Sequence, residues 1–258
     1  TEGLSLYEFV PFAEPAAQPL AFDPQMRDRI MIDTIHDGCV IPPEFLKNEA
    51  GEAFEEEALY KHYVLERDWG ANLVAEHVAR FLGLPGYYRV NVARVLMDFG
   101  RFPGTTPRNA PHLQRYAINY PFSHLLSYQQ KRRVLETCYD QISSRIEHYI
   151  RNKLVKVAIH TYDTYNASGT IRPPTSLVSR SVNYQQHSEM PVGVFDPLFP
   201  DILAEFTADR TLRDRLSLTL ERAQIPAAHN FPYCLPEGSI EVRSQVWFFF
   251  AYVRQAYE

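Results

Sequence analysis

Two histidines each follow an apolar run and precede a loop that contains an aspartate. His36 ends the run in "IMIDTIHDG", and His160 ends the run in "LVKVAIHTYD". Both runs are short, apolar and rich in β-branched residues, which predicts buried strands. In open α/β sheets, ligands bind beyond the carboxyl ends of the strands, so both imidazoles are expected at one rim of the sheet. A lone histidine there is usually an ordinary polar residue, whereas two together favour a metal site.

A metal site of this kind needs a third ligand. Catalytic zinc typically takes three protein ligands from His, Asp, Glu or Cys and keeps one position open. Asp68 in "ERDWGAN" is the candidate, because it lies where a helix should begin and could reach over the rim, although it could equally cap that helix. The HExxH signature is absent, and Cys39 and Asp163 occupy the third position after each histidine, where HxxE would need glutamate. The residues alone leave both interpretations open.

The expected elements that position these residues alternate between strand and helix. Strands are predicted at 29–36, 87–97 and 154–160, and at the start of "GSIEVR". Helices are predicted over 67–83, over 124–152 and within 200–224, the first from the helical spacing of Leu73, Val74, His77, Val78 and Phe81. The alternation predicts a three-layer αβα sandwich with a largely parallel sheet. Residues 1–28, with four prolines and no period, are expected as an extended arm, and 29–258 as a single domain.

Composition and charge exclude several classes of function. The 258 residues are 45% apolar and 22% charged, which is typical of a globular protein, and the net charge of −5 gives no footprint for nucleic acid or anionic membrane. We therefore expect a small-molecule or peptide partner. The apolar run "VWFFFAYV" is far shorter than the ~20 residues of a membrane span. No secretory signal is recognised, and three widely spaced cysteines form no evident disulfide framework, so a cytoplasmic location is expected.

Six short motifs, in order, resemble those of a known enzyme family. They are "IHDG" with "IPPEF", "RDWGANLV", "RVLMDFGR", "IHTYD", "HNFPY" and "SIEVR", and the similarity extends from about residue 30 to residue 253. Together they resemble the N-formylglutamate amidohydrolases. The resemblance implies a fold similar to zinc carboxypeptidases and aspartoacylases, which is a mixed αβα sandwich with one divalent metal, expected to be zinc, at the rim of the sheet.

The resemblance also implies roles in the metal centre. His36, Asp68 and His160 would be the metal ligands. Glu241 would act as general base toward the water that the metal activates, because a nearby carboxylate can take its proton and pass it to the leaving amine. From the residues alone, Glu241 could instead be a strand residue that faces solvent or pairs with Arg243.

A second group of residues would bind the substrate. Arg94, Asp98 and Arg101 match a clamp on a substrate carboxylate, for which the planar fork of arginine is suited. Surface ion pairs within their loop are the alternative. Asn230 would orient the substrate amide or merely cap a turn, and Arg243 is counted with the substrate-binding residues.

The departures from the family motifs lie in loops expected to face the substrate. Asp37 replaces a serine, Gly100 replaces an asparagine, and Cys234 stands where the family has a glycine-rich turn. The predicted function is metal-dependent hydrolysis of an N-acyl, specifically N-formyl, amino acid or a related small amide. Two alternatives stay open: a hydrolase of a modified amino acid or peptide in a specialised pathway, and a non-catalytic protein that binds an acidic metabolite or a partner protein.

Overall fold

The structure is a computed structural model that describes residues 5–12, 23–109, 116–165, 168–179, 210–235, 240 and 244. The chain divides into two compact units, residues 1–161 and residues 162–258, and each is described by itself. All three candidate metal ligands belong to the first unit. The single domain expected over 29–258 stays a prediction. No helix in the described part of the chain is both long and apolar enough to cross a bilayer.

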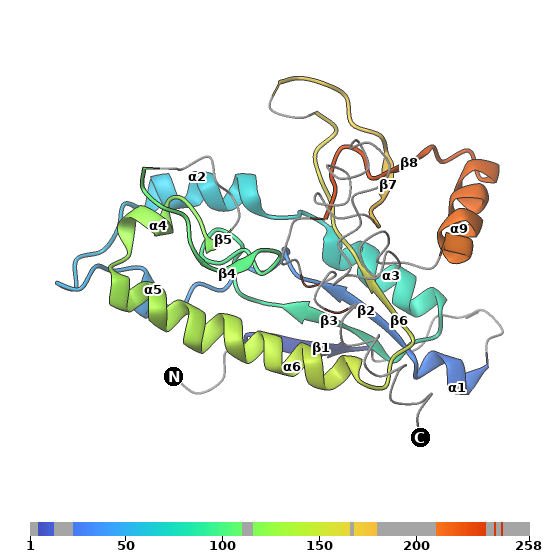
Figure 1. Ribbon diagram of the computed structural model, residues 1–258, viewed down its shortest axis with the longest axis horizontal. Coiled ribbons are helices and arrows are strands. Elements are labelled where there is room, and N and C mark those ends of the chain that lie inside the picture. The colour runs from blue at the N-terminus through green and yellow to red at the C-terminus, as the bar shows by residue number, and fades with distance from the viewer. Residues whose placement is uncertain are drawn as a thin grey trace, which may run out of the picture. The chain divides into compact units, whose positions relative to one another are not determined.

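A four-stranded sheet of order β1-β3-β2-β6 forms the centre of the first unit (Figure 1). Its strands are β1 (Tyr7–Pro11), β2 (Ile30–Thr34), β3 (Gly86–Val90) and β6 (Val155–Ala158). β2 pairs in parallel with both β3 and β6, whereas β1 pairs antiparallel with β3. The sheet is therefore mixed and largely parallel, which confirms the predicted fold class. Residues 7–11 of the expected arm form a strand of this sheet.

Helices cover both faces of the sheet. On one face α3 (Ala71–Phe81) packs through Ala75 and Ala79 against Ile32 of β2 and Tyr87 of β3. On the other face lies α6 (Asp140–Ile150), whose Tyr149 ring has its centroid 4.9 Å from that of Tyr88 (Figure 1). Successive residues of a strand point to opposite faces of the sheet. Tyr87 therefore packs on the side of α3, and Tyr88 packs on the side of α6. This arrangement gives the first unit its three layers.

The buried face of α3 differs from the one that the spacing of its large apolar residues suggests. Leu73 and Phe81 are 60% and 57% exposed, while the alanines of the helix are fully buried. Small side chains let a helix backbone lie close to a sheet, and the local sequence does not reveal that close contact. The helix begins four residues later than predicted, because Gly70 precedes it with a φ of +81°, a conformation that favours glycine.

The long helix predicted over 124–152 is interrupted. α4 (Phe122–Leu125) ends at Leu126, whose backbone is extended, and a new helix starts after Ser127. Ser127 and Gln130 form a capping box, in which each side chain binds the other residue's backbone N–H. α5 (Tyr128–Val134) then continues through the π-helical turn η2 (Leu135–Tyr139) into α6.

The segment after β3 is a buried loop where a longer strand was predicted. The strand ends at Val90, and the chain turns at Ala93, whose carbonyl accepts hydrogen bonds from the N–H groups of Leu96 and Met97. The loop is fixed to β5 (Tyr116–Ile118), because the Asp98 N–H donates to the Ala117 carbonyl at 2.8 Å. The remaining elements of the first unit are α1 (Pro24–Arg27), η1 (Pro43–Phe45), α2 (Glu56–Glu66), β4 (Phe102–Thr105) and β5 (Tyr116–Ile118), the last two forming a small parallel sheet.

The second unit contains a parallel pair of short strands and a helix. β7 (Thr175–Leu177) pairs with β8 (Ala227–His229), and α9 (Arg210–Arg222) contacts β8, where the Ser217 hydroxyl lies 2.9 Å from His229 Nε2. Ile240 and Ser244 have helical backbone conformation, so the strand predicted at "GSIEVR" is wrong at Ile240. Glu241 and Arg243 lie outside the described residues.

Candidate metal centre

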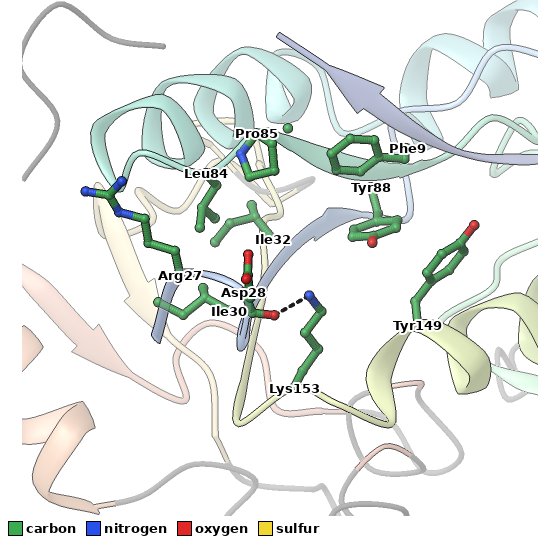
Figure 2. A pocket seen from close by; sticks show the side chains of 11 residues that line it. Phe9, Arg27, Asp28, Ile30, Ile32, Leu84, Pro85, Tyr88, Tyr149 and Lys153 are labelled. Atoms are coloured by element: carbon green, nitrogen blue, oxygen red, sulfur yellow. Dashed lines mark hydrogen bonds between the residues drawn. The ribbon is translucent and has the colours of Figure 1, made fainter. Parts of the chain in front are cut away.

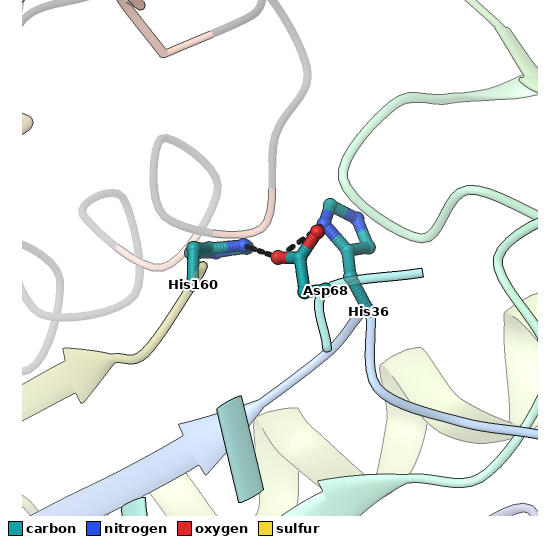
Figure 3. Close-up of side chains that lie close together, drawn as sticks. All are labelled: His36, Asp68 and His160. Carbon is teal, nitrogen blue, oxygen red and sulfur yellow. Dashed lines mark hydrogen bonds and ion pairs between the residues drawn. The ribbon is translucent and has the colours of Figure 1, made fainter. Parts of the chain in front are cut away.

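Three side chains that are distant in the sequence meet at the rim of the sheet in the first unit (Figure 3). His36 follows β2, His160 follows β6, and Asp68 lies in the connection between α2 and α3. One potential ligand atom from each residue lies within 4.8 Å of the other two. The parallel pairing of β2 with β6 places both histidines at the carboxyl ends of neighbouring strands, which is the convergence that the sequence predicts.

The geometry of the cluster suits a cation. Asp68 Oδ2 lies 2.9 Å from His160 Nδ1 and 3.6 Å from His36 Nδ1. The side chains of His36 and Asp68 are 8% and 7% exposed, whereas that of His160 is 37% exposed. Two imidazoles and a carboxylate are a donor set that catalytic zinc uses, and the exposed side at His160 leaves access for a further ligand. The residues present therefore fit a divalent metal ion.

Asp98 orients His36 from outside the cluster. His36 Nε2 lies 2.8 Å from Asp98 Oδ1, and because an ionised carboxylate can only accept, Nε2 carries the proton. The lone pair of His36 Nδ1 is then available on the side of Asp68 and His160. The backbone N–H of Gly100 also donates to Asp98 Oδ1, at 2.9 Å. A carboxylate on the second nitrogen of a ligand histidine fixes its tautomer and ring orientation.

Arg94 connects the carboxylates of Asp68 and Asp98. Its Nη1 donates to Asp68 Oδ1 and its Nε donates to Asp98 Oδ2, both at 3.1 Å. A third bond goes from Nη1 to the Glu66 carbonyl at 3.3 Å. Arg94 thus holds one oxygen of Asp68 and leaves the other facing the histidines. Arg101 differs, because its Nε is 3.8 Å from Asp98 Oδ2 and has no hydrogen-bond acceptor in the described part of the chain.

These contacts shift the pKa values of the buried groups. Burial alone would raise the pKa of Asp68, but its contacts with His160 and His36 lower it well below its ordinary value. Burial would also raise the pKa of Asp98, and the charge of Arg94 and the contact with His36 hold it well below its usual range. Burial would lower the pKa of Arg94, which its neighbouring carboxylates raise instead. Both carboxylates therefore stay ionised at neutral pH.

The chain is similar in fold to a solved amidohydrolase. The N-formylglutamate amidohydrolase from Ralstonia eutropha JMP134 aligns with a TM-score of 0.50 and 12% identity over 98% of this chain and 97% of that chain. A gene product of Agrobacterium tumefaciens aligns with a TM-score of 0.50 and 16% identity over 88% of this chain and 76% of that chain. No protein-family model and no curated protein sequence matches the chain. At these identities the likeness shows the fold.

The other predicted site residues fall into the second unit. Asn230 has a φ of +53°, and its Oδ1 accepts a hydrogen bond from the Ser179 N–H at 2.8 Å. This contact joins the ends of β7 and β8, which is the turn-holding role considered as its alternative. The predicted roles of Glu241 and Arg243 concern residues outside the described ones and stay predictions.

Sequence reasoning missed an ion pair that adjoins the cluster. Asp37, interpreted as a substrate-facing departure, is 1% exposed and accepts a hydrogen bond from Arg67 Nε at 2.9 Å. A signal for this pair was present in the sequence, because Asp37 directly follows one candidate ligand, His36, and Arg67 directly precedes another, Asp68. Opposite charges beside two residues that must meet can pair when those residues come together.

A separate cavity lies at the opposite ends of the parallel strands (Figure 2). It has a volume of about 280 Å³ and lies where β2 and β3 begin, with Phe9 and Tyr88 among its lining residues. Lys153 Nζ donates to the Asp28 carbonyl at 2.6 Å across its margin. None of the predicted site residues lines this cavity, so it is not part of the metal centre.

Proposed function

We propose that the chain is a metal-dependent amidohydrolase that cleaves an N-acyl amino acid, with N-formyl amino acids as the first candidates. The observation that carries this proposal is the cluster of His36, Asp68 and His160, with Asp98 on the second nitrogen of His36. The fold that the chain shares with a solved N-formylglutamate amidohydrolase supports it.

The cluster residues would hold the metal, for which zinc is the first candidate. A divalent cation there supplies Lewis-acid polarisation of an amide carbonyl and lowers the pKa of a water molecule to about 7. Asp98 keeps the proton of His36 on Nε2, and Arg94 holds Asp68 Oδ1. Arg101 is proposed to bind the substrate carboxylate, because its Nε has no acceptor among the described residues, whereas Arg94 already binds Asp68, Asp98 and the Glu66 carbonyl.

Proton transfer is proposed to involve Glu241, on the basis of the motif resemblance. A carboxylate at the reacting centre would take a proton from the attacking water and deliver it to the leaving amine. Asn230 and Arg243 are proposed as further substrate contacts on the same basis. Replacement of Glu241 by glutamine tests its role: turnover should fall sharply while metal content stays unchanged, and loss of the metal would argue against it.

The direct test is metal content together with amide hydrolysis. Protein purified without added metal should contain close to one equivalent of a divalent ion by elemental analysis and release formate from N-formylglutamate. His160→Ala should lower metal affinity roughly a hundredfold or more and abolish turnover, since a ligand is lost outright. The control is His77→Ala, because His77 is exposed on α3.

Two outcomes would contradict parts of this proposal. Full metal occupancy in His160→Ala would remove His160 from the ligand set. Wild-type protein that neither contains nor binds a divalent metal would refute the metal-dependent reaction and favour a non-catalytic binding protein. Metal-loaded protein that is inactive on N-formylglutamate would favour the second candidate, a hydrolase of a modified amino acid or peptide. Gly100 favours that candidate, because it replaces the asparagine of the family motif beside the candidate ligand His36.

A further inference from the structure

The candidate ligands His36 and Asp68 lie on separate segments that need a fixed relative position. His36 lies in the loop after β2, and Asp68 lies between α2 and α3. One backbone hydrogen bond joins them, from the Asp68 N–H to the His36 carbonyl at 3.1 Å. A metal site needs its ligands held within about 0.5 Å of the productive geometry, which requires support from packing and further hydrogen bonds. Asp98 and Arg94 connect the two side chains, but a single backbone hydrogen bond does not fix the orientation of one segment against the other.

Asp37 supplies two more bonds between the same segments. Its Oδ1 accepts from Arg67 Nε at 2.9 Å, and its Oδ2 accepts from the Asn72 N–H at 3.0 Å. The two donors lie on either side of Asp68 in the sequence. The Asp37 side chain therefore binds the Asp68 segment both before and after the candidate ligand.

The bond to Asn72 also completes the start of α3. The first N–H groups of a helix have no partner within the helix, and a capping side chain normally satisfies one of them. Gly70 occupies the N-cap position and has no side chain to do so. Asp37, which lies on a different segment, accepts this hydrogen bond in place of an N-cap side chain. Its negative charge also suits the positive end of the helix dipole.

Arg67 is itself held in place. Its guanidinium carbon lies 4.5 Å from the centroid of the Trp69 ring, and its Nη1 donates to the Tyr63 hydroxyl. The carbonyl of Asp37 accepts a third contact, from Arg89 Nη2 of β3 at 3.0 Å. With side chains only 1% and 16% exposed, Asp37 and Arg67 form a mostly buried pair that solvent screens little.

We propose that Asp37 is a positioning residue that holds Asp68 against His36 through Arg67 and the first turn of α3. The inference rests on the proposed metal site. Asp37 is not one of the candidate ligands; it would act through the segment that carries Asp68.

The test uses the metal alone as probe. The dissociation constant for Co²⁺ and the visible absorption of the Co²⁺ protein are measured for the wild type, Asp37→Asn and Glu76→Gln. Asparagine keeps the volume of Asp37 but presents an NH₂ group to one of its two donors. Co²⁺ affinity should fall roughly tenfold or more, as expected when a residue that supports a ligand is removed, and the absorption bands should change because the ligands move.

Glu76→Gln is the matched control, because it removes the ion pair between Glu76 and Arg80 on the same helix α3. Its Co²⁺ affinity and absorption should equal those of the wild type. Wild-type affinity and absorption in Asp37→Asn would overturn the inference while leaving the proposed function intact. A wild type that binds no Co²⁺ would refute the metal site itself. If Asp37→Asn does not fold, Arg67→Gln carries the test with the same two readings.

Discussion

At the scale of single residues, Gly100 leaves little room for a side chain beside the candidate metal centre. A Cβ atom placed there would lie 3.1 Å from both His36 Nε2 and Asp98 Oδ1, closer than ordinary van der Waals contact. Gly100→Ala should therefore push His36 away from Asp98 and lower metal affinity roughly tenfold, by disturbing the group that orients a ligand. Titration with Co²⁺ measures the change.

Gly51→Ala separates this effect from a general loss of stability. Gly51 has a φ of +84°, so alanine is strained there, but a Cβ would meet no atom within 4 Å. Its thermal midpoint should fall while its metal affinity stays at the wild-type value. Unchanged metal affinity in Gly100→Ala would contradict this prediction, because it would mean that the added methyl group does not disturb His36 as a ligand.

The ligand candidates were predictable from the sequence, whereas their supporting contacts were not. His36 and His160 are visible because each ends an apolar run, a purely local pattern. The contacts of Arg94 with Asp68 and Asp98 depend on a turn at Ala93 that the apparent alternation of residues 87–97 conceals. Arg94 and Asp98 were assigned to a substrate clamp from the motif resemblance, which identifies residue types but does not show where their side chains point.

At the scale of elements, the start of α5 depends on a capping box. The Ser127 hydroxyl accepts from the Gln130 N–H at 3.2 Å and donates to Glu49 Oε1 at 2.6 Å. Ser127→Ala should lower the free energy of unfolding by about 1 kcal/mol, the usual effect of losing an N-cap. Chemical denaturation measures the difference.

Ser144→Ala is the control for that change, because Ser144 is exposed within α6 and its hydroxyl only binds the Asp140 carbonyl of its own helix. Its effect should stay within about 0.5 kcal/mol. A loss in Ser127→Ala no larger than in Ser144→Ala would contradict the importance of the cap.

The elements were predicted better than their ends. The helix expected over 124–152 exists, but the capping box starts it at Tyr128, and helical periodicity alone does not identify the break at Leu126. In α3 the large apolar residues indicated the helix correctly but not its buried face. Alanine gives a weak periodic signal, so a close approach between helix and sheet leaves little trace in the sequence.

At the scale of the whole molecule, the placement of all three candidate ligands in one unit has a thermodynamic consequence. A ligand that binds only the folded state stabilises it by about 2.7 kcal/mol when its free concentration is 100 times its dissociation constant. Zinc should therefore raise the unfolding midpoint of residues 1–161. Trp247→Phe leaves Trp69 as the single tryptophan, so its fluorescence reports the first unit.

The control for this experiment is the same variant with His160→Ala added. Zinc should leave the unfolding midpoint of that double variant almost unchanged, and a chelator should reverse the shift in the parent. Equal shifts in both proteins would show that zinc binds elsewhere.

The largely parallel character of the sheet was predictable because strands and helices alternate along the chain. The partner of the first segment was not, since β1 pairs with residues about eighty positions away. Such pairing depends on tertiary contacts that local propensity does not record. The strand expected at "GSIEVR" was likewise predicted from local β propensity, and the helical backbone at Ile240 contradicts it.

The π-helical turn Leu135–Tyr139 has a consequence for comparisons with related proteins. Its i→i+5 pattern fits one more residue into a turn than a regular α-helix does, and such turns are frequent near functional sites. Here it directs the Tyr139 hydroxyl to the Arg101 carbonyl at 2.7 Å. An alignment with a protein of the same fold whose helix is regular should open a one-residue gap within 135–139, and that gap would mark the chains in which a tyrosine supports this arginine.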